Sequence, residues 1–246
     1  MIRPGLLLIP LLLAASSTPS VHAESYWQKQ ANKLLDTRQH KPGKLTSDEI
    51  GRAFKQALNL GADQVVARLG KTDGFNTDSV IRILLPDDLQ KARKLLKKVG
   101  QQQYADELEL RLNRAAELAT PKARELFVQA IQSMTFSDIM TIYNGPDDSA
   151  TRYFEQAMSA QLAAAMRPIV DDSLAQVKAV ESYEKLAKRY NKLPFTRKLE
   201  ADLGGHVVSR GMSGIFHYLA KEEAAIRQQP RRHTTELLRK VFGRLQ

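Results

Sequence analysis

The sequence of 246 residues contains no cysteine. Its fold therefore has no disulfide bond, and catalysis by a thiolate nucleophile is excluded. A sequence without cysteine also offers no N-terminal cysteine to which a lipid could be attached, so we expect no lipid anchor. The length suits one domain with a sizeable core or two small ones, and packing of the core alone must stabilise the fold.

Several catalytic motifs are also missing. The chain has no glycine-rich phosphate loop followed by Lys-Ser or Lys-Thr, no His-Glu-x-x-His zinc pair and no Gly-x-Ser-x-Gly nucleophile elbow. His206 and His217 would lie about 16 Å apart along a helix, too far to bind one metal ion. We therefore expect no metal and no cofactor, and these absences favour a protein that is not an enzyme.

The long hydrophobic run of the sequence is confined to the N-terminus. Arg3 precedes an apolar stretch from Leu6 to Ala15, which is short for a membrane span. Val21-His22-Ala23 resembles a signal-peptidase site, so we expect residues 1–23 to be a cleaved signal peptide. No second run of this kind follows. We therefore expect a soluble periplasmic protein without a transmembrane segment.

Acidic residues are outnumbered by basic ones. The chain has 37 Lys and Arg against 27 Asp and Glu, a formal net charge of +10, and removal of the signal peptide takes away only Arg3. In an export compartment the available anions are anionic lipid, lipopolysaccharide and cell-wall polymer, so nucleic acid is not the expected partner. The sequence does not predict the oligomeric state.

Helical periodicity dominates the chain after a polar segment at 24–44. Apolar residues recur every three or four positions, which predicts an all-α, single-domain bundle of roughly eight mostly short helices over residues 45–246. Thr46 and Glu49 form a capping box at the start of the first helix. Val80 to Leu85 is the only β-like run, and one short run predicts an extended connector because it cannot form a sheet.

Two prolines predict further boundaries. Thr120-Pro121 has the composition of a helix start, with Thr as the cap and Pro at the first helical position. Pro168 is expected to break or kink the following helix. Near the C-terminus, Asp202 to Arg227 predicts one long helix or two helices divided at Gly211.

The segment from Asp87 to Gly100 predicts a helix that separates apolar from basic residues. Leu89, Ala92, Leu95, Leu96 and Val99 occupy one side. The segment forms either an anion-binding or membrane-surface helix or an ordinary amphipathic helix docked on the core. The basic side holds the candidate anion-binding residues Lys91, Arg93, Lys94, Lys97 and Lys98.

A turn with the sequence Asn-Gly-Pro-Asp-Asp, residues 144–148, lies near the middle of the chain. Ser137 is expected to cap a short helix that ends at the turn, and Asp147 or Asp148 is expected to cap the next helix. The same acids could instead form a hydrolytic site with Asn113 or Arg114 as polar partners. Adjacent carboxylates on a helix point about 100° apart, so such a site needs partners from elsewhere. The candidate functional turn comprises Asn144, Gly145, Pro146, Asp147, Asp148 and Thr151.

Five sequence segments carry a resemblance to a known family. They are Asn144–Phe154, Val66–Phe75, Leu112–Ala116, Tyr190–Phe195 and Arg232–Leu238. Together they make the chain similar, from about Leu45 to Gly243, to the bacterial envelope family named domain of unknown function 4197. The resemblance implies a helical, exported protein, and it implies no activity and no catalytic residue.

Three functions remain open at this point. The leading hypothesis is a non-enzymatic envelope protein that binds an anionic or amphipathic partner. A second is a helical carrier of a hydrophobic ligand, since methionines line adaptable pockets. A third is a hydrolase that uses the acidic turn. The methionines that suggest the carrier are Met134, Met140, Met158, Met166 and Met212.

Overall fold

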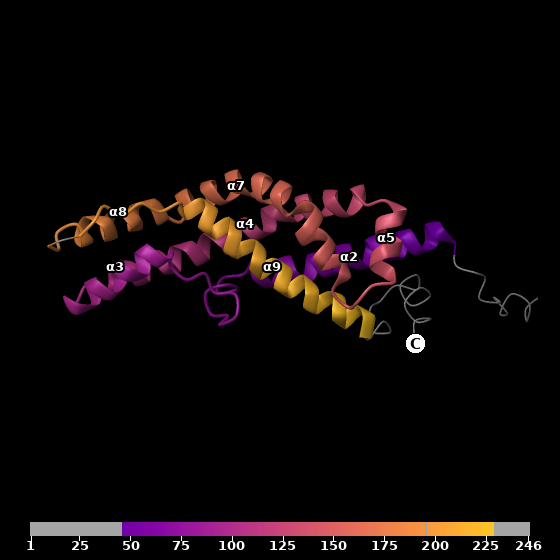
Figure 1. Ribbon diagram of the computed structural model, residues 1–246, viewed down its shortest axis with the longest axis horizontal. Helices are drawn as coiled ribbons and strands as arrows, with labels where there is room; N and C mark the ends of the chain where they lie inside the picture. Colours follow the sequence, from indigo (N-terminus) through magenta and orange to yellow (C-terminus); the bar gives the residue numbers. More distant parts are fainter. Residues whose placement is uncertain (1–45, 195, 229–246) are drawn as a thin grey trace, which may run out of the picture. The chain divides into compact units, whose positions relative to one another are not determined.

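A computed structural model describes residues 46–194 and 196–228 (Figure 1). Within these residues the chain forms eight α-helices, one turn of π-helix and no strand, which confirms the all-α prediction. The predicted signal peptide, the polar segment and the last predicted helix lie outside the described residues. The elements are α2 (Ser47–Leu69), α3 (Asp87–Lys98), α4 (Gln103–Ser133), α5 (Phe136–Tyr143), α6 (Ser149–Tyr153), η1 (Phe154–Met158), α7 (Ser159–Gln176), α8 (Ala179–Tyr190) and α9 (Leu203–Gln228).

The longest helix, α4, is the centre of the packing. It contacts α2, α3, α7, α8 and α9, and Figure 1 shows α7 running alongside it. Its apolar face buries Leu108, Leu112 and Phe127 at 2% exposure or less. Phe127 also makes an edge-to-face contact with Phe216 of α9, with ring centroids 6.2 Å apart. Burial of such side chains supplies the main stabilising free energy of the fold.

Two predicted helix boundaries are wrong. The chain does not start a new helix at Thr120-Pro121, because α4 continues through both residues. Thr120 is buried, and its hydroxyl donates a hydrogen bond to the carbonyl of Ala116 at 2.7 Å. Pro168 likewise lies inside α7 without ending it. An internal proline costs about 3 kcal/mol, and tertiary packing along the whole helix offsets that cost.

The helix starts show which capping predictions hold. In α2 the Glu49 amide donates to the Thr46 hydroxyl at 3.2 Å and the Thr46 amide donates to the Glu49 carboxylate at 2.9 Å, so this capping box is confirmed. The predicted cap at Ser137 is wrong, because Thr135 and Asp138 form the capping box of α5. A reciprocal box satisfies two backbone donors, whereas a single serine cap satisfies one.

The segment between α2 and α3 contains no strand, as the connector prediction requires. Asp73 within it has a positive φ of 66°, an uncommon conformation for a residue other than glycine. Ile81, Ile83 and Leu85 are buried, whereas Val80 and Leu84 are exposed. Such a loop has no backbone ladder to fix it, so side chains from the helices must supply its hydrogen bonds.

Candidate functional site

A row of buried polar side chains on α4 receives the loop between α2 and α3. Glu109, Asn113 and Glu117 are spaced four residues apart and therefore lie on one face of the helix. Their exposed fractions are 2%, 0% and 4%. Buried polar groups are nearly always hydrogen-bonded in folded proteins, and each of these three contacts the loop.

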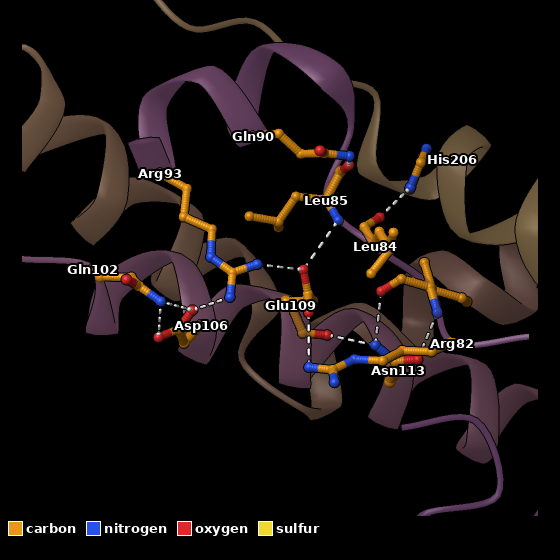
Figure 2. A network of polar contacts seen from close by, with 11 residues as sticks. Arg82, Leu84, Leu85, Gln90, Arg93, Gln102, Asp106, Glu109, Asn113 and His206 are labelled. Atoms are coloured by element: carbon orange, nitrogen blue, oxygen red, sulfur yellow. Dashed lines mark hydrogen bonds and ion pairs between the residues drawn. The ribbon is translucent and has the colours of Figure 1, made fainter. Parts of the chain in front are cut away.

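Glu109 is held by two arginines from outside α4 (Figure 2). Its carboxylate accepts hydrogen bonds from Arg82 at 2.8 Å and from Arg93 at 3.1 Å. The backbone amide of Leu85 also donates to it, at 3.4 Å. Two guanidinium groups compensate the cost of burying this charge. Glu109 therefore joins the loop and α3 to α4.

Asn113 makes the two hydrogen bonds to the Ile83 backbone that a neighbouring strand would make in a sheet. Its side-chain oxygen accepts from the Ile83 amide at 2.9 Å, and its side-chain nitrogen donates to the Ile83 carbonyl at 2.8 Å. The same nitrogen donates to the carbonyl of Glu109 at 2.8 Å. Both N–H donors of the side chain are therefore occupied. Asn113 holds the loop in place.

Arg114 belongs to a separate cluster at the start of the loop. It donates to Glu117 at 2.7 Å and to Asp73 at 2.8 Å. Glu117 in turn accepts from the backbone amides of Phe75 and Asn76. The side-chain amide of Asn76 and then the Arg114 guanidinium lower the pKa of Asp73. This cluster fixes the residue that has the positive φ.

The polar network also orients α3. Arg93 points toward α4, where it lies 2.6 Å from Asp106 as well as 3.1 Å from Glu109 (Figure 2). Gln90 donates to the carbonyl of Leu85 at 2.8 Å. Arg93 was expected on the basic, solvent-facing side of α3. It instead forms ion pairs on the side of α3 that faces α4. The buried carboxylate of Glu109 and the exposed carboxylate of Asp106 make this position favourable for its charge.

The opposite side of α3 faces solvent. Lys91 pairs with Asp88 at 2.9 Å. Lys94, Lys97 and Lys98 are exposed and form no ion pair with any residue that the structure describes. These three lysines are the part of the predicted anion-binding set that remains available for a partner.

Two apolar residues of α3 lie among these lysines. Burial follows the spacing of Leu89, Ala92 and Leu96, whereas Leu95 is 37% and Val99 49% exposed. The prediction that Leu95 and Val99 share the docked side is therefore wrong. α3 packs against α4 and α8, and only its residues on the side that faces these helices are buried. We call Lys94, Leu95, Lys97, Lys98 and Val99 the α3 basic face.

The central turn is built differently from its prediction. Asp148 occupies the N-cap position of α6, but its carboxylate makes no capping hydrogen bond and accepts from Arg152 at 2.9 Å. Asp147 accepts from Gln228 at 3.1 Å. The cap comes from Glu223 of α9, which accepts from the backbone amide of Thr151 at 3.0 Å. A buried carboxylate from another helix therefore does what a local aspartate was expected to do.

The remaining residues of the turn also have structural partners. The Asn144 side chain donates to the carbonyl of Met140 at 2.9 Å, and the Pro146 carbonyl accepts from Ser149 at 2.8 Å. A β-carbon at Gly145 would come within 3.0 Å of the β-carbon of Ser149, so the turn leaves little room for a larger residue.

The structure does not join the turn to its proposed polar partners. Within residues 46–194 and 196–228, no hydrogen bond or ion pair connects Asp147 or Asp148 with Asn113 or Arg114. The first pair of residues contacts α6 and α9, and the second pair contacts the loop before α3. Nothing in this geometry supports a hydrolytic site shared between them.

Within the described residues, three of the five methionines behind the carrier hypothesis lie in the core. Met134, Met166 and Met212 are buried at 6% exposure or less and belong to the core. Met212 also lines an open groove of about 600 Å³ between α7 and α9. The apolar cavity beside Phe127 and Ile131 has a volume of only about 20 Å³, too small for a lipid chain.

The polar residues that sequence reasoning missed share one signal. Glu109 and Glu117 interrupt the apolar face of α4, and Glu223 interrupts that of α9. A charged residue inside an apolar helical stripe needs a buried partner. This signal would have marked all three residues, although it would not have named their partners.

Two broader observations concern the described residues as a whole. They contain no group of three or more His, Asp or Glu side chains placed to bind a metal ion. None of their helices combines the length and the apolar character that crossing a membrane requires.

Comparison with known proteins gives one match. The family described as protein of unknown function DUF4197 matches residues 44–243. The chain belongs to this family. No curated protein and no solved structure matches the chain. Membership of DUF4197 assigns no activity, so any function must be argued from the site itself.

Proposed function

We propose that this chain is an exported, non-enzymatic envelope protein that attaches to the surface of an anionic lipid membrane through the α3 basic face. The observation that carries the proposal is the set of three exposed lysines without ion-pair partners among the described residues, with Leu95 and Val99 exposed beside them. The signal-peptide pattern and the excess of basic residues support export and an acidic partner.

Exposed apolar residues distinguish a lipid surface from a soluble anionic polymer. Lysines attract either partner, but Leu95 and Val99 gain free energy only where they can leave water. Each lysine close to an acidic membrane contributes about 1 kcal/mol, so three contribute about 3 kcal/mol. The resulting attachment is reversible and weakens with salt. On α8, which contacts α3, Lys185 and Lys188 are also exposed and add to the positive potential.

The rigid docking of α3 supports this role. Arg93 and Gln90 fix its inner side to α4 and to the loop, so the lysines are presented outward without reorganisation of the helix. A binding helix that is already ordered loses less conformational entropy on association.

The test is co-sedimentation of the purified protein with vesicles of mixed phosphatidylglycerol and phosphatidylcholine, compared with vesicles of phosphatidylcholine alone. We expect binding to the acidic vesicles only, and less of it in high salt. The variant K94E/K97E/K98E should lose this binding. The matched control K71E/K122E/K178E makes the same change of charge at exposed lysines elsewhere and should keep most of it.

Equal loss in both variants would show that net charge alone controls binding and would overturn the proposal for α3. Binding to lipopolysaccharide or to a cell-wall polymer but not to the vesicles would assign the partner to that other class of anion.

A further inference from the structure

An open cleft of about 670 Å³ separates the loop residues 79–87 and Gln90 from α9. It lies apart from the α3 basic face, because none of the five residues of that face lines it. Figure 2 shows part of its lining, with Leu84 and Leu85 on the loop, Gln90 on α3 and His206 on α9.

The α9 wall of the cleft is a polar stripe. His206, Arg210, Ser213 and His217 line it at spacings of four, three and four residues. At 100° per residue these positions fall within about 60° of one another around the helix axis. They therefore share one face, and that face forms the wall of the cleft.

Two exposed residues of this stripe have side-chain hydrogen-bonding capacity that the described residues leave unused. The side chains of Arg210 and Ser213 make no ion pair or hydrogen bond with any of them. His217 contributes to the shape of the wall, because its Nε2 is buried and closed to the cleft. A cation and a hydroxyl that converge on one cleft are typical of a site that binds an anion.

The fourth residue, His206, holds the opposite wall. Its Nε2 lies 2.7 Å from the carbonyl oxygen of Leu84, and because a carbonyl only accepts, this nitrogen donates. The hydrogen bonds of Asn113 to Ile83 and of Glu109 to Leu85 fix the same strip of backbone from below. The loop wall is therefore preformed, as most ligand sites are.

The loop wall is apolar where it meets the cleft. Val80 is 62% and Leu84 53% exposed, and both line it. Arg82 is already paired with Glu109, whereas the carboxylate of Asp87 lines the cleft without an ion pair to any described residue. Arg210 is thus the cleft's cation without a partner among the described residues, and it faces a wall with exposed aliphatic side chains.

From this arrangement we infer that the cleft binds an amphipathic anion, a carboxylate or a phosphate monoester carried on an alkyl chain. Its oxyanion accepts hydrogen bonds from the side chains of Arg210 and Ser213, and its alkyl chain packs on Val80 and Leu84. A guanidinium group matches the two oxygens of either head group. The inference is independent of membrane attachment through the α3 basic face.

Isothermal titration calorimetry of the purified protein tests the site, with decanoate and decyl phosphate below their micelle concentrations as probes. At least one should bind, and acetate should bind more weakly because it lacks the alkyl chain. R210Q should weaken binding by about tenfold or more, the effect of removing a charged hydrogen-bond donor. K122Q, which removes an exposed lysine of α4, is the matched control and should bind as the unmodified protein does.

Ser213 provides a second variant that separates binding from folding. S213A removes an exposed hydroxyl that lines the cleft and has no partner among the described residues, so we expect weaker probe binding with an unchanged melting temperature. The lysine variant K94E/K97E/K98E should retain full affinity for the probe, which distinguishes this site from the membrane surface. Failure of both probes to bind, or equal affinity of R210Q and the unmodified protein, would overturn the inference.

Discussion

Glu223 and Arg227 lie one turn apart on α9, and together they hold both ends of the central turn. Glu223 accepts from the backbone amides of Ala150 at 2.9 Å and Thr151 at 3.0 Å in the first turn of α6. Arg227 donates to the carbonyl of Ile142 at 2.8 Å in the last turn of α5. The two side chains are 3.0 Å apart and each is 8% exposed. Each charge has the sign that the adjacent helix dipole favours.

Loss of Glu223 should therefore destabilise the whole fold. In E223A the guanidinium of Arg227 stays buried without its carboxylate and α6 loses its cap, so we expect the free energy of unfolding to fall by about 3–5 kcal/mol. Urea denaturation followed by circular dichroism measures this. E184A, which removes an exposed carboxylate from α8, is the control and should change stability little. A loss below about 1 kcal/mol in E223A would contradict the role of the pair.

Replacing the side-chain amide of Asn113 with a carboxylate should destabilise the fold. In N113D a carboxylate oxygen would face the carbonyls of Ile83 and Glu109, which now accept from the side-chain nitrogen. We expect a loss of about 3 kcal/mol, because two donors are replaced by a buried charge. Hydrogen exchange at the amide of Ile83 should accelerate in the same variant. N144D, at an exposed position of the central turn, is the comparison, and equal stability of both variants would show that the loop does not need Asn113.

Acid should remove a stabilising contribution from Asp78. The hydroxyl of Tyr218 donates to this carboxylate and is the main cause that holds the pKa of Asp78 below its ordinary value of 3.8. A carboxylate with a lowered pKa in the folded state stabilises the fold above the unfolded pKa and ceases to do so as the pH falls through the folded pKa. The stability advantage over Y218F should therefore be full above about pH 5 and shrink below pH 4.

Urea denaturation of both proteins at a series of pH values measures that advantage. Carbon-detected NMR titration of the Asp78 carboxyl group should show its pKa rising in Y218F. A stability difference that stays constant down to acid pH would mean that Tyr218 contributes through packing and its hydrogen bond with Arg68, and not through the charge of Asp78.

Two glycines of α9 should respond to alanine in opposite directions. A β-carbon at Gly211 would meet nothing within 4 Å, so G211A should stabilise the helix by about 1 kcal/mol. A β-carbon at Gly214 would lie 2.8 Å from the Phe75 ring and 3.2 Å from Ile81, so G214A should cost about 1–3 kcal/mol. The melting temperatures of the two variants test this prediction. A shift of the same sign in both would contradict the packing of the loop against α9.

The periodicity of the sequence predicted much of the fold. The start of α2 at its capping box and the strandless connector before α3 follow from residues a few positions apart. For α9 the sequence left open a division at Gly211, and the structure shows one continuous helix. The two prolines misled the prediction because their local effect is real, but α4 and α7 are stabilised along their lengths by neighbouring helices.

The candidate site was predicted less completely. The separation of apolar and basic residues on α3 indicated which lysines face solvent. It also placed Arg93 on that side, because the sequence does not show that the buried Glu109 of α4 faces α3. Asn113 was considered for catalysis since a polar residue near an apolar face has no visible partner in the sequence. Its partner is Ile83, thirty positions away.

The sequence by itself determined the helical class, the capping box of α2 and the amphipathic character of α3, because those features depend on interactions within one or two turns. Only the tertiary structure decided which charged side chain serves which backbone group. Glu223 caps a helix 73 residues earlier in the chain, and His206 holds a carbonyl 122 residues earlier. Such pairs form when separate helices pack together, and no local spacing encodes them.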